Sequence, residues 1–234
     1  MEKETITIQI QRGESREYFE VSKTLTLLAA LYEIKEEKDA TLTFSAGCRS
    51  SICGACTVRV NEKEVLACAY TMQENDVIQP LKYHPLLRDL KVDRHHSLTT
   101  LKNAQSWIKE YHPIPLTDKE IVNIETQSDC ILCSACYSSC PVYAVNPHFL
   151  GPFTLTHIYR LSEDLRENKE HLTEIQNNGI WDCTLCGACS EVCPKGIDSK
   201  MDIMNLRMLS IQNGYSDPSF QINSFGTPDF SMGF

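Results

Sequence analysis

The chain has 234 residues, with 22 lysine and arginine residues against 31 aspartate and glutamate residues, for a formal net charge of −9. This length predicts one or two domains. The acidic balance, without a dense basic stripe, argues against nucleic-acid binding. No apolar run is as long as the roughly 18 residues that a transmembrane helix requires, so we expect no span of its own.

The first half is predicted to be rich in strands. Residues 5–10 alternate between apolar and polar side chains, which is typical of a half-buried strand, and residues 17–21 form a return strand. Residues 24–34 are apolar at helical spacing. Shorter strands are expected at 42–44, 57–60, 64–68 and 77–81, with a tight turn at Asn61-Glu62-Lys63. Two strands, a helix and further strands around a cysteine-rich loop resemble the β-grasp fold of plant-type ferredoxins.

That loop contains the first of three cysteine blocks. Its spacing, Cys48-x4-Cys53-x2-Cys56-x11-Cys68, is that of plant-type ligands for a [2Fe–2S] cluster. Small residues in the loop let backbone N–H groups approach the cluster sulfurs and offset their negative charge; they are Gly47, Gly54 and Ala55. Arg49 is either a counter-charge to the cluster or a solvated loop arginine.

A proline-punctuated link follows, and the second half is predicted to be helical. We expect helices at 99–111, with Trp107 and Ile108 facing inward, at 154–167 and at 198–212. Thr117-x-x-Glu120 predicts a capping box for a helix through residue 126. The histidines of the link, His84, His95 and His96, are interpreted as surface residues. The predicted domains are a β-grasp [2Fe–2S] domain over 1–98 and an α-helical two-cluster domain over 99–234, which makes the fold class α+β.

Two further cysteine blocks lie 53 residues apart and share one spacing. Cys130-x2-Cys133-x2-Cys136-x3-Cys140-Pro141 and Cys183-x2-Cys186-x2-Cys189-x3-Cys193-Pro194 each match the bacterial [4Fe–4S] pattern. In two-cluster ferredoxins the fourth cysteine of each run ligates the other cluster. One cubane is therefore assigned to Cys130, Cys133, Cys136 and Cys193, and the other to Cys140, Cys183, Cys186 and Cys189.

Two other uses of twelve cysteines fit the sequence less well. Six disulfides would need an oxidising compartment, whereas the charged start at residues 1–5 lacks the apolar core of a secretory signal. Zinc needs four ligands, usually as two pairs separated by a loop. All twelve cysteines fall within the three iron–sulfur blocks, so one-electron transfer is the simplest interpretation.

Sequence beyond the cysteines resembles the iron–sulfur subunit of succinate dehydrogenase and fumarate reductase. The resemblance covers nearly the whole chain in order. It rests on the link that begins Ile78-Gln79-Pro80-Leu81, on Cys140-Pro141-Val142-Tyr143 with the following Asn146-Pro147, and on Asn178-Gly179-Ile180-Trp181 before Cys183. It implies an electron-transfer subunit of a succinate:quinone oxidoreductase or quinol:fumarate reductase, inert alone, acting between the FAD of a flavoprotein subunit and a quinone-linked third subunit.

Two departures from this family narrow the resemblance. Many members lack a cysteine at the position of Cys186 and carry a [3Fe–4S] cluster there; with Cys186 present, a second [4Fe–4S] cluster is expected, and [3Fe–4S] stays open. Thr184 replaces a histidine on the quinone side of the family. Both resemble the archaeal and epsilonproteobacterial branch, which includes methylmenaquinol:fumarate reductases. The third subunit there is either cysteine-rich or a membrane anchor.

Other functions remain as alternatives. One is a free-standing polyferredoxin. The other is the electron-transfer subunit of another flavoprotein oxidoreductase, of the glycolate oxidase or heterodisulfide reductase type. A peripheral position on the cytoplasmic face of the inner membrane is expected, and the periplasmic face follows instead if the chain is exported together with a partner. The sequence does not fix the direction of electron flow.

Overall fold

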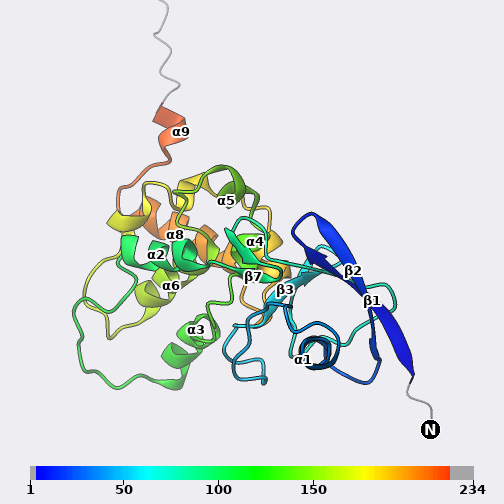
Figure 1. The fold of residues 1–234 in the computed structure, drawn as a ribbon. Coiled ribbons are helices and arrows are strands. Elements are labelled where there is room, and N and C mark those ends of the chain that lie inside the picture. Colours follow the sequence, from blue (N-terminus) through cyan, green and yellow to red (C-terminus); the bar gives the residue numbers. More distant parts are fainter. Residues whose placement is uncertain (1–3, 222–234) are drawn as a thin grey trace, which may run out of the picture.

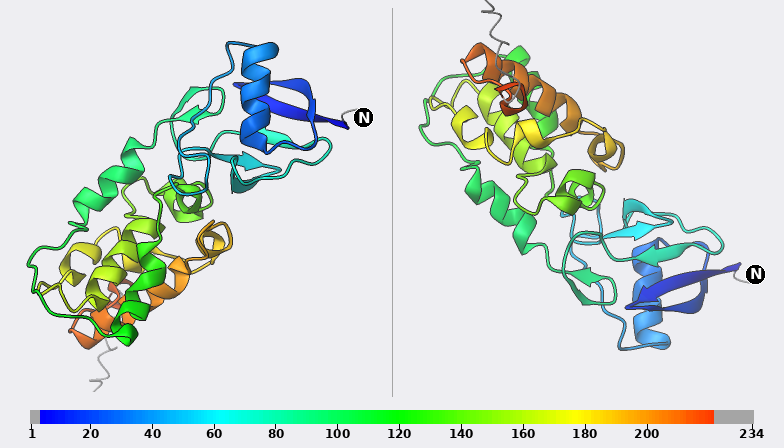
Figure 2. Two further views of the ribbon diagram at one scale, coloured as in Figure 1. Left: turned by 90° about the horizontal axis from the view of Figure 1, so that it is seen from below. Right: turned by 90° about the horizontal axis from the view of Figure 1, so that it is seen from above.

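The computed structural model describes residues 4–221 and has two halves that lie end to end (Figure 1 and Figure 2). The first half holds the strands and helix α1 (Leu27–Glu37), and the second holds the other helices. The α+β class predicted from the sequence is confirmed. No helix among the described residues is long and apolar enough to cross a bilayer.

The first half is built on a five-stranded mixed sheet in the order β2-β1-β5-β3-β4. β1 is antiparallel to β2 and parallel to β5, which gives the β-grasp arrangement. The strands are β1 (Thr5–Arg12), β2 (Ser15–Ser22), β3 (Thr57–Val60), β4 (Lys63–Leu66), β5 (Val77–Gln79), and the separate hairpin β6 (Leu86–Arg88) and β7 (Lys91–Val92).

Strand periodicity and helix capping explain the core of this half. Ile6, Ile8 and Ile10 alternate along β1 and are buried, as expected of a strand with one face toward the core. The apolar face of α1, which begins at the N-cap Thr26, packs on them through residues that include Leu27 and Leu31. The tight turn after β3 uses positive φ angles at Asn61 (49°) and Glu62 (70°), which match the twist of a two-residue hairpin.

The second half is a helical layer centred on α6, which packs against α8 and α3. Gly151 precedes α6 with φ of 83°, and an added Cβ there would lie 2.2 Å from the ring of the buried Tyr137. Only glycine therefore fits this position. The helices are α2 (His95–Asn103), α3 (Asp118–Ser128), α4 (Ala135–Ser138), α5 (Pro141–Val145), α6 (Pro152–Glu163), α7 (Ala188–Glu191), α8 (Ser199–Gln212) and α9 (Pro218–Gln221), with 3-10 turns η1 (Leu172–Ile175) and η2 (Ile180–Asp182).

Some local predictions are confirmed and others are wrong. The capping box is present, since the Thr117 backbone N–H donates to the Glu120 carboxylate over 2.6 Å at the start of α3. The strand expected at 42–44 does not form. The Thr43 N–H is instead taken by the Asp89 side chain (2.8 Å), and the Thr43 carbonyl accepts a bond from Leu90 (3.1 Å).

The helix expected at 99–111 is also wrong in its bounds. α2 begins earlier and ends at Asn103, after which Gln105 takes φ of 48° and the Ser106 N–H bonds to the Leu101 carbonyl. This left-handed residue closes the helix. Trp107 is therefore 49% exposed rather than inward-facing, and Ile108 is 37% exposed. The domain boundary at 98/99 falls inside α2 and stays a prediction.

His84 is not the surface residue that the sequence suggested. It is 9% exposed, its Nδ1 lies 2.7 Å from the Lys82 carbonyl, and burial lowers its pKa. His95 is exposed; His96 is exposed as a residue, but its Nδ1 lies 2.6 Å from the Tyr143 hydroxyl. The Nδ1 atoms of His84 and His96 are therefore each engaged in a hydrogen bond within this chain.

A buried ion pair of the first half is hydrogen-bonded to the second half. Arg59 on β3 and Glu64 on β4 have side chains that are each 4% exposed, with Nε and Oε1 3.5 Å apart. The same Oε1 accepts a 2.7 Å hydrogen bond from Ser138 at the end of α4, and the Ser138 hydroxyl accepts one from the Lys82 N–H. Both Arg59 Nε and Nη2 otherwise lack a hydrogen-bond partner, so the charge of Glu64 is the main compensation for this guanidinium.

We expect Glu64→Gln to destabilise the chain by about 3 kcal/mol, because removing one partner of a buried pair leaves an uncompensated buried charge. The amide keeps an acceptor for Ser138, so the loss reports the charge rather than that hydrogen bond. The midpoint of urea-induced unfolding, followed by far-UV circular dichroism under anaerobic conditions, measures it. Glu62→Gln in the adjacent exposed turn is the matched control; equal midpoints for the two variants would contradict the prediction.

Candidate metal centres

The N-terminal site is formed by Cys48, Cys53, Cys56 and Cys68, which the loop after α1 gathers around β3 and β4. Backbone N–H groups of Ser50, Ile52 and Cys53 lie 3.3–3.4 Å from the Cys48 sulfur. Arg49 and Ser51 adopt positive φ angles of 60° and 59°. This alternation turns successive amides toward one centre, which is the geometry of an anion-binding nest.

The pKa values of three thiols of this site are shifted in different directions. Hydrogen bonds from the amides of Ser50, Ile52 and Cys53 lower the pKa of Cys48 to about 6. Burial raises the pKa of Cys56 to about 11. At Cys68 burial also acts to raise the pKa, but hydrogen bonds from Ser51 and Cys56 outweigh it and lower the value. The amides around Cys48 are therefore already oriented to stabilise a thiolate at this exposed position of the loop.

The central site is a cavity whose wall contains Cys130, Cys133, Cys136 and Cys193. These are the four cysteines that the crossed assignment groups together. Apolar side chains such as Phe153 and Ile197 complete the wall, with Thr156, Ser199 and Lys195. Burial raises the pKa of Cys130 to about 11 and that of Cys136 well above its ordinary value.

The C-terminal site is a second cavity, and its wall contains Cys140, Cys183, Cys186 and Cys189. Phe149, Ile203 and Lys200 lie in the same wall. Burial raises the pKa of Cys189 to about 12. The structure therefore brings together the second predicted set as well, including Cys186. The ligand roles of all twelve cysteines stay predictions.

The two blocks repeat in backbone conformation as well as in sequence. Leu132 (φ 51°) and Ser134 (64°) in the first block correspond to Leu185 (55°) and Gly187 (83°) in the second. Each block then enters a one-turn helix, α4 or α7. Left-handed residues after the first and second cysteines turn the loop around its cavity. The sequence shows the cysteine repeat, but leucine and serine give no local sign of this conformation.

Rings of thiols around cavities suit clusters of several iron and sulfide atoms. A zinc ion, by contrast, needs its thiolates about 2.3 Å from one point. Among residues 4–221, no group of three or more histidine, cysteine or acidic side chains is close enough to hold one metal ion. Burial raises the pKa of Cys130, Cys136 and Cys189, so binding of clusters by these thiols would release protons.

Burial differs along the row of sites. Cys48 and Cys53 are exposed at the N-terminal site and Cys186 is exposed at the C-terminal site, whereas no cysteine of the central site is exposed. The central site touches the N-terminal site through Gly54 and Cys133. It is joined to the C-terminal site by the short segments Cys136–Cys140 and Cys189–Cys193, whose ends line different cavities.

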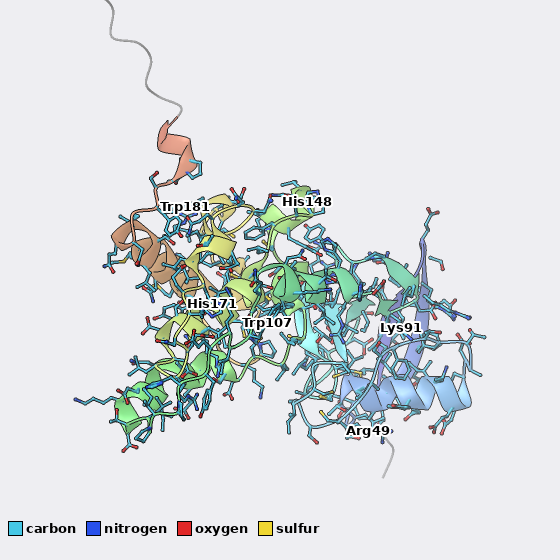
Figure 3. All side chains as sticks on the ribbon, turned by 90° about the vertical axis from the view of Figure 1, so that its left-hand side faces the viewer. Arg49, Lys91, Trp107, His148, His171 and Trp181 are labelled. Atoms are coloured by element: carbon cyan, nitrogen blue, oxygen red, sulfur yellow. The ribbon has the colours of Figure 1, made fainter. Side chains whose placement is uncertain are left out.

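Charged and aromatic side chains near the sites have defined contacts. Arg49 lies beside α1, with its guanidinium 4.6 Å from the ring centroid of Tyr32, and it lines the same surface pocket as Cys68 (Figure 3). Trp181, in the other half of the molecule, donates to the Gln176 side chain over 2.8 Å (Figure 3). Lys195 and Lys200 line the two cavities, which favours charge compensation over simple solvation.

Asp202 was not predicted from the sequence. It lies on α8 and is 2% exposed, and its carboxylate accepts hydrogen bonds from Gln127 (2.9 Å) and from Thr156 (2.7 Å) of the central wall. Burial raises its pKa to about 6. An acidic residue inside an amphipathic helix pattern gives no sequence signal of burial.

Comparisons with protein families agree with the two halves. Residues 8–99 match the 2Fe-2S iron–sulfur cluster binding domain, and residues 126–197 match the 4Fe-4S dicluster domain. The chain thus carries a [2Fe–2S] domain followed by a dicluster domain, as the cofactor prediction required.

Relatives and a solved structure extend this likeness. The 8-methylmenaquinol:fumarate reductase iron–sulfur subunit of Wolinella succinogenes is 36% identical over 81% of this chain, which spans 65% of that protein's length. The fumarate reductase iron–sulfur subunit of Escherichia coli is 34% identical, covering 75% of this chain and 77% of that protein. A chain of the Mycobacterium smegmatis Sdh1 complex in the apo form has the same fold, with a TM-score of 0.82 at 19% identity over 92% of this chain and 99% of that one.

We expect Cys186→Ser to convert the C-terminal site from a four-iron to a three-iron cluster. The three remaining cysteines of that wall still hold a cluster, so total iron should fall only from about ten to about nine per chain. Anaerobic iron and sulfide analysis, with EPR of the oxidised protein, measures the change. Cys189→Ser, which removes a buried cysteine of the same wall, is the comparison and should lose more iron. An unchanged iron content and an unchanged EPR spectrum in Cys186→Ser would mean that Cys186 is not a ligand.

We expect Asp202→Asn to stabilise the chain at pH 8 by up to about 3 kcal/mol, from a pKa raised by about two units. The folded carboxyl has the higher pKa (about 6 against 3.8), so the native state loses stability as pH rises between these values. The gain should therefore shrink at pH 5. Urea unfolding midpoints at the two pH values measure it, with the exposed Glu125→Gln as control. A gain that is equal at both values would contradict this account.

Proposed function

Because the chain belongs to the family of succinate dehydrogenase and fumarate reductase iron–sulfur subunits, we propose that it relays single electrons between a FAD-containing flavoprotein subunit and a quinone-linked third subunit. The observation that carries the proposal is the row of three thiol-lined sites, each touching the next. A carrier with one exchangeable partner would not need three centres in series.

The chain's own residues would hold the clusters, shield them from water and influence their reduction potentials. When bound, the clusters supply one-electron redox chemistry, whereas a flavin also exchanges electrons in pairs. Oriented amides at Cys48 and the lysines Lys195 and Lys200 offset negative charge. Apolar side chains in the wall of the central site, such as Phe153 and Ile197, limit the access of water to it. Charge, hydrogen bonds and solvent exposure set the potentials of such clusters, so these features would determine the order of reduction along the row.

The exposed ends of the row support a position between two partners. At one end Cys48 and Cys53 are exposed beside α1, and we assign this end to the flavoprotein. At the other end Cys186 is exposed, and we assign it to the quinone-linked subunit. Apolar side chains are exposed along one face of α8, close to this end; they are Met201, Met204, Met208 and Ile211. Thr184 lies in the cavity wall rather than a histidine, which favours quinone contact by the third subunit instead of this chain.

The second centre of the helical half is proposed to be [4Fe–4S], since Cys186 completes the thiol ring of the C-terminal site. Membrane attachment is proposed to come through the third subunit, which is cysteine-rich or an anchor, with the cytoplasmic face as the expected side. A free-standing polyferredoxin is the competing function, and it would purify without a flavoprotein.

We expect the isolated chain to accept electrons from dithionite and to leave fumarate unchanged, because within residues 4–221 we identify no acid–base pair or hydride donor for a dicarboxylate beside the cysteines. The complex with its flavoprotein should reduce fumarate with an artificial donor. Cys53→Ser should lower the quinol-driven rate at least about tenfold, while the flavoprotein's dye-linked rate stays near wild type. Equal losses in both assays would mean that the N-terminal domain stabilises the flavoprotein rather than transferring its electrons. Purification without any flavin-containing chain would favour the polyferredoxin.

A further inference from the structure

The two halves meet at one close backbone contact between cluster-binding loops. Gly54 lies between Cys53 and Cys56, has φ of 65°, and packs against Cys133 of the central site. A Cβ at Gly54 would lie 2.7 Å from the Cys133 Cβ and 3.0 Å from the Ile131 carbonyl oxygen. No side chain larger than hydrogen fits there. Cys133 also belongs to the apolar core of the β-grasp half. We call this contact of Gly54 with Cys133 the crossing point between the N-terminal and central sites.

Arg94 bridges the crossing point. Its Nη1 donates to the Gly54 carbonyl over 3.0 Å and to the Cys133 carbonyl over 3.2 Å. The Gly54 carbonyl accepts a second bond from the Thr57 hydroxyl (2.8 Å), which uses its remaining lone pair. One guanidinium nitrogen therefore links the backbones of two loops that belong to different sites.

The backbone of Arg94 is itself held on the helical side. Arg94 is the N-cap of α2, and its carbonyl accepts bonds from the Ser97 hydroxyl (3.0 Å) and the Leu98 N–H (3.2 Å). The Ser97 hydroxyl lies 3.2 Å from that of Ser134, in the loop between Cys133 and Cys136. Within residues 4–221 no carboxylate forms an ion pair with Arg94, so its charge is directed at the crossing point.

We propose that Arg94 is a positioning residue that fixes the crossing point between the N-terminal and central sites and stabilises negative charge on both sides of it. The inference rests on the proposed function. With clusters bound in both sites, one electron would leave the reduced cluster of one site and enter the oxidised cluster of the other, with no proton transferred and no covalent bond changed. The cluster charges change by one unit in opposite senses. A cation bonded to both loops lies where this charge moves, and the two hydrogen bonds from its Nη1 keep the loops from separating.

Substitution of Arg94 in the full, cluster-loaded chain separates the two parts of this role. Arg94→Met removes charge and donors, Arg94→Gln keeps a donor without the charge, and Arg94→Lys keeps the charge without the fork. The control is Arg88→Met, an arginine of the nearby hairpin that is 58% exposed and lies 3.8 Å from Asp89. Each protein is titrated anaerobically with dithionite and followed by EPR, which reports the midpoint potential of each centre and the spin–spin interaction between neighbouring reduced centres.

We expect Arg94→Met to retain its iron but to lose much of the spin–spin interaction between the N-terminal and central sites. The one-electron equilibria of these two sites should shift by about tenfold toward the oxidised form, from loss of a partly buried charge, which is about 59 mV. The C-terminal site should not move. Arg94→Lys should restore the potentials, and Arg94→Gln should lower them while keeping more of the interaction than Arg94→Met. Arg88→Met should match wild type.

Unchanged potentials and an unchanged interaction in Arg94→Met would overturn the proposal, because a purely structural hydrogen bond would leave both as they are. If Arg94→Met loses its clusters, the test rests on Arg94→Gln and Arg94→Lys: equal potentials in these two variants would overturn it. The chemical reductant replaces the flavoprotein. A failure to find a fumarate-linked partner would therefore sink the proposed function without touching this result, and the reverse also holds.

Discussion

The helical half depends on one topological constraint, which is that each cysteine block contributes its fourth thiol to the cavity of the other. Cys193 lies in the wall of the central cavity with the first three cysteines of the first block. Cys140 lies in the wall of the C-terminal cavity with Cys183, Cys186 and Cys189. Neither cavity can be assembled from one block alone. The segment between the blocks must therefore fold back on itself before either ring closes, and α6, which packs against both α3 and α8, is the element that brings them together.

The same constraint explains why the helical half manages with a modest apolar core. Its short helices, α4 and α7, are single turns that would not be stable in isolation. They are held because each runs between cysteines that belong to different cavities. Clusters bound as proposed would join distant parts of the chain and stabilise the fold in the same way that a structural metal does. Packing of Tyr137 and Phe153 beside these turns then orients them.

Much of this architecture was readable from the cysteines and the strand periodicity. The alternation along β1, the capping box before α3 and the order of the three blocks depend on local sequence, and all three were predicted correctly. The failures came where tertiary contacts replace local preference. Residues 42–44 have a strand pattern, yet Asp89 takes the Thr43 amide. His84 has polar neighbours in the sequence but is buried beneath the link. Arg94 bonds to Gly54 and Cys133, and their closeness cannot be predicted from the spacing of residues in the sequence.

The contrast in burial between the middle and the ends of the row has a consequence for assembly. Oxidants reach thiols and clusters according to their access, and the exposed cysteines are those at the two ends, whereas none lies at the central site. Damage to a free chain would therefore begin at the ends and advance inward. Any proteins that cover those ends would do more than exchange electrons with the chain, because they would also shield the cysteines that are most exposed among residues 4–221. A chain without its partners would therefore lose the clusters at its two ends before the central one, and this loss would identify it as unassembled.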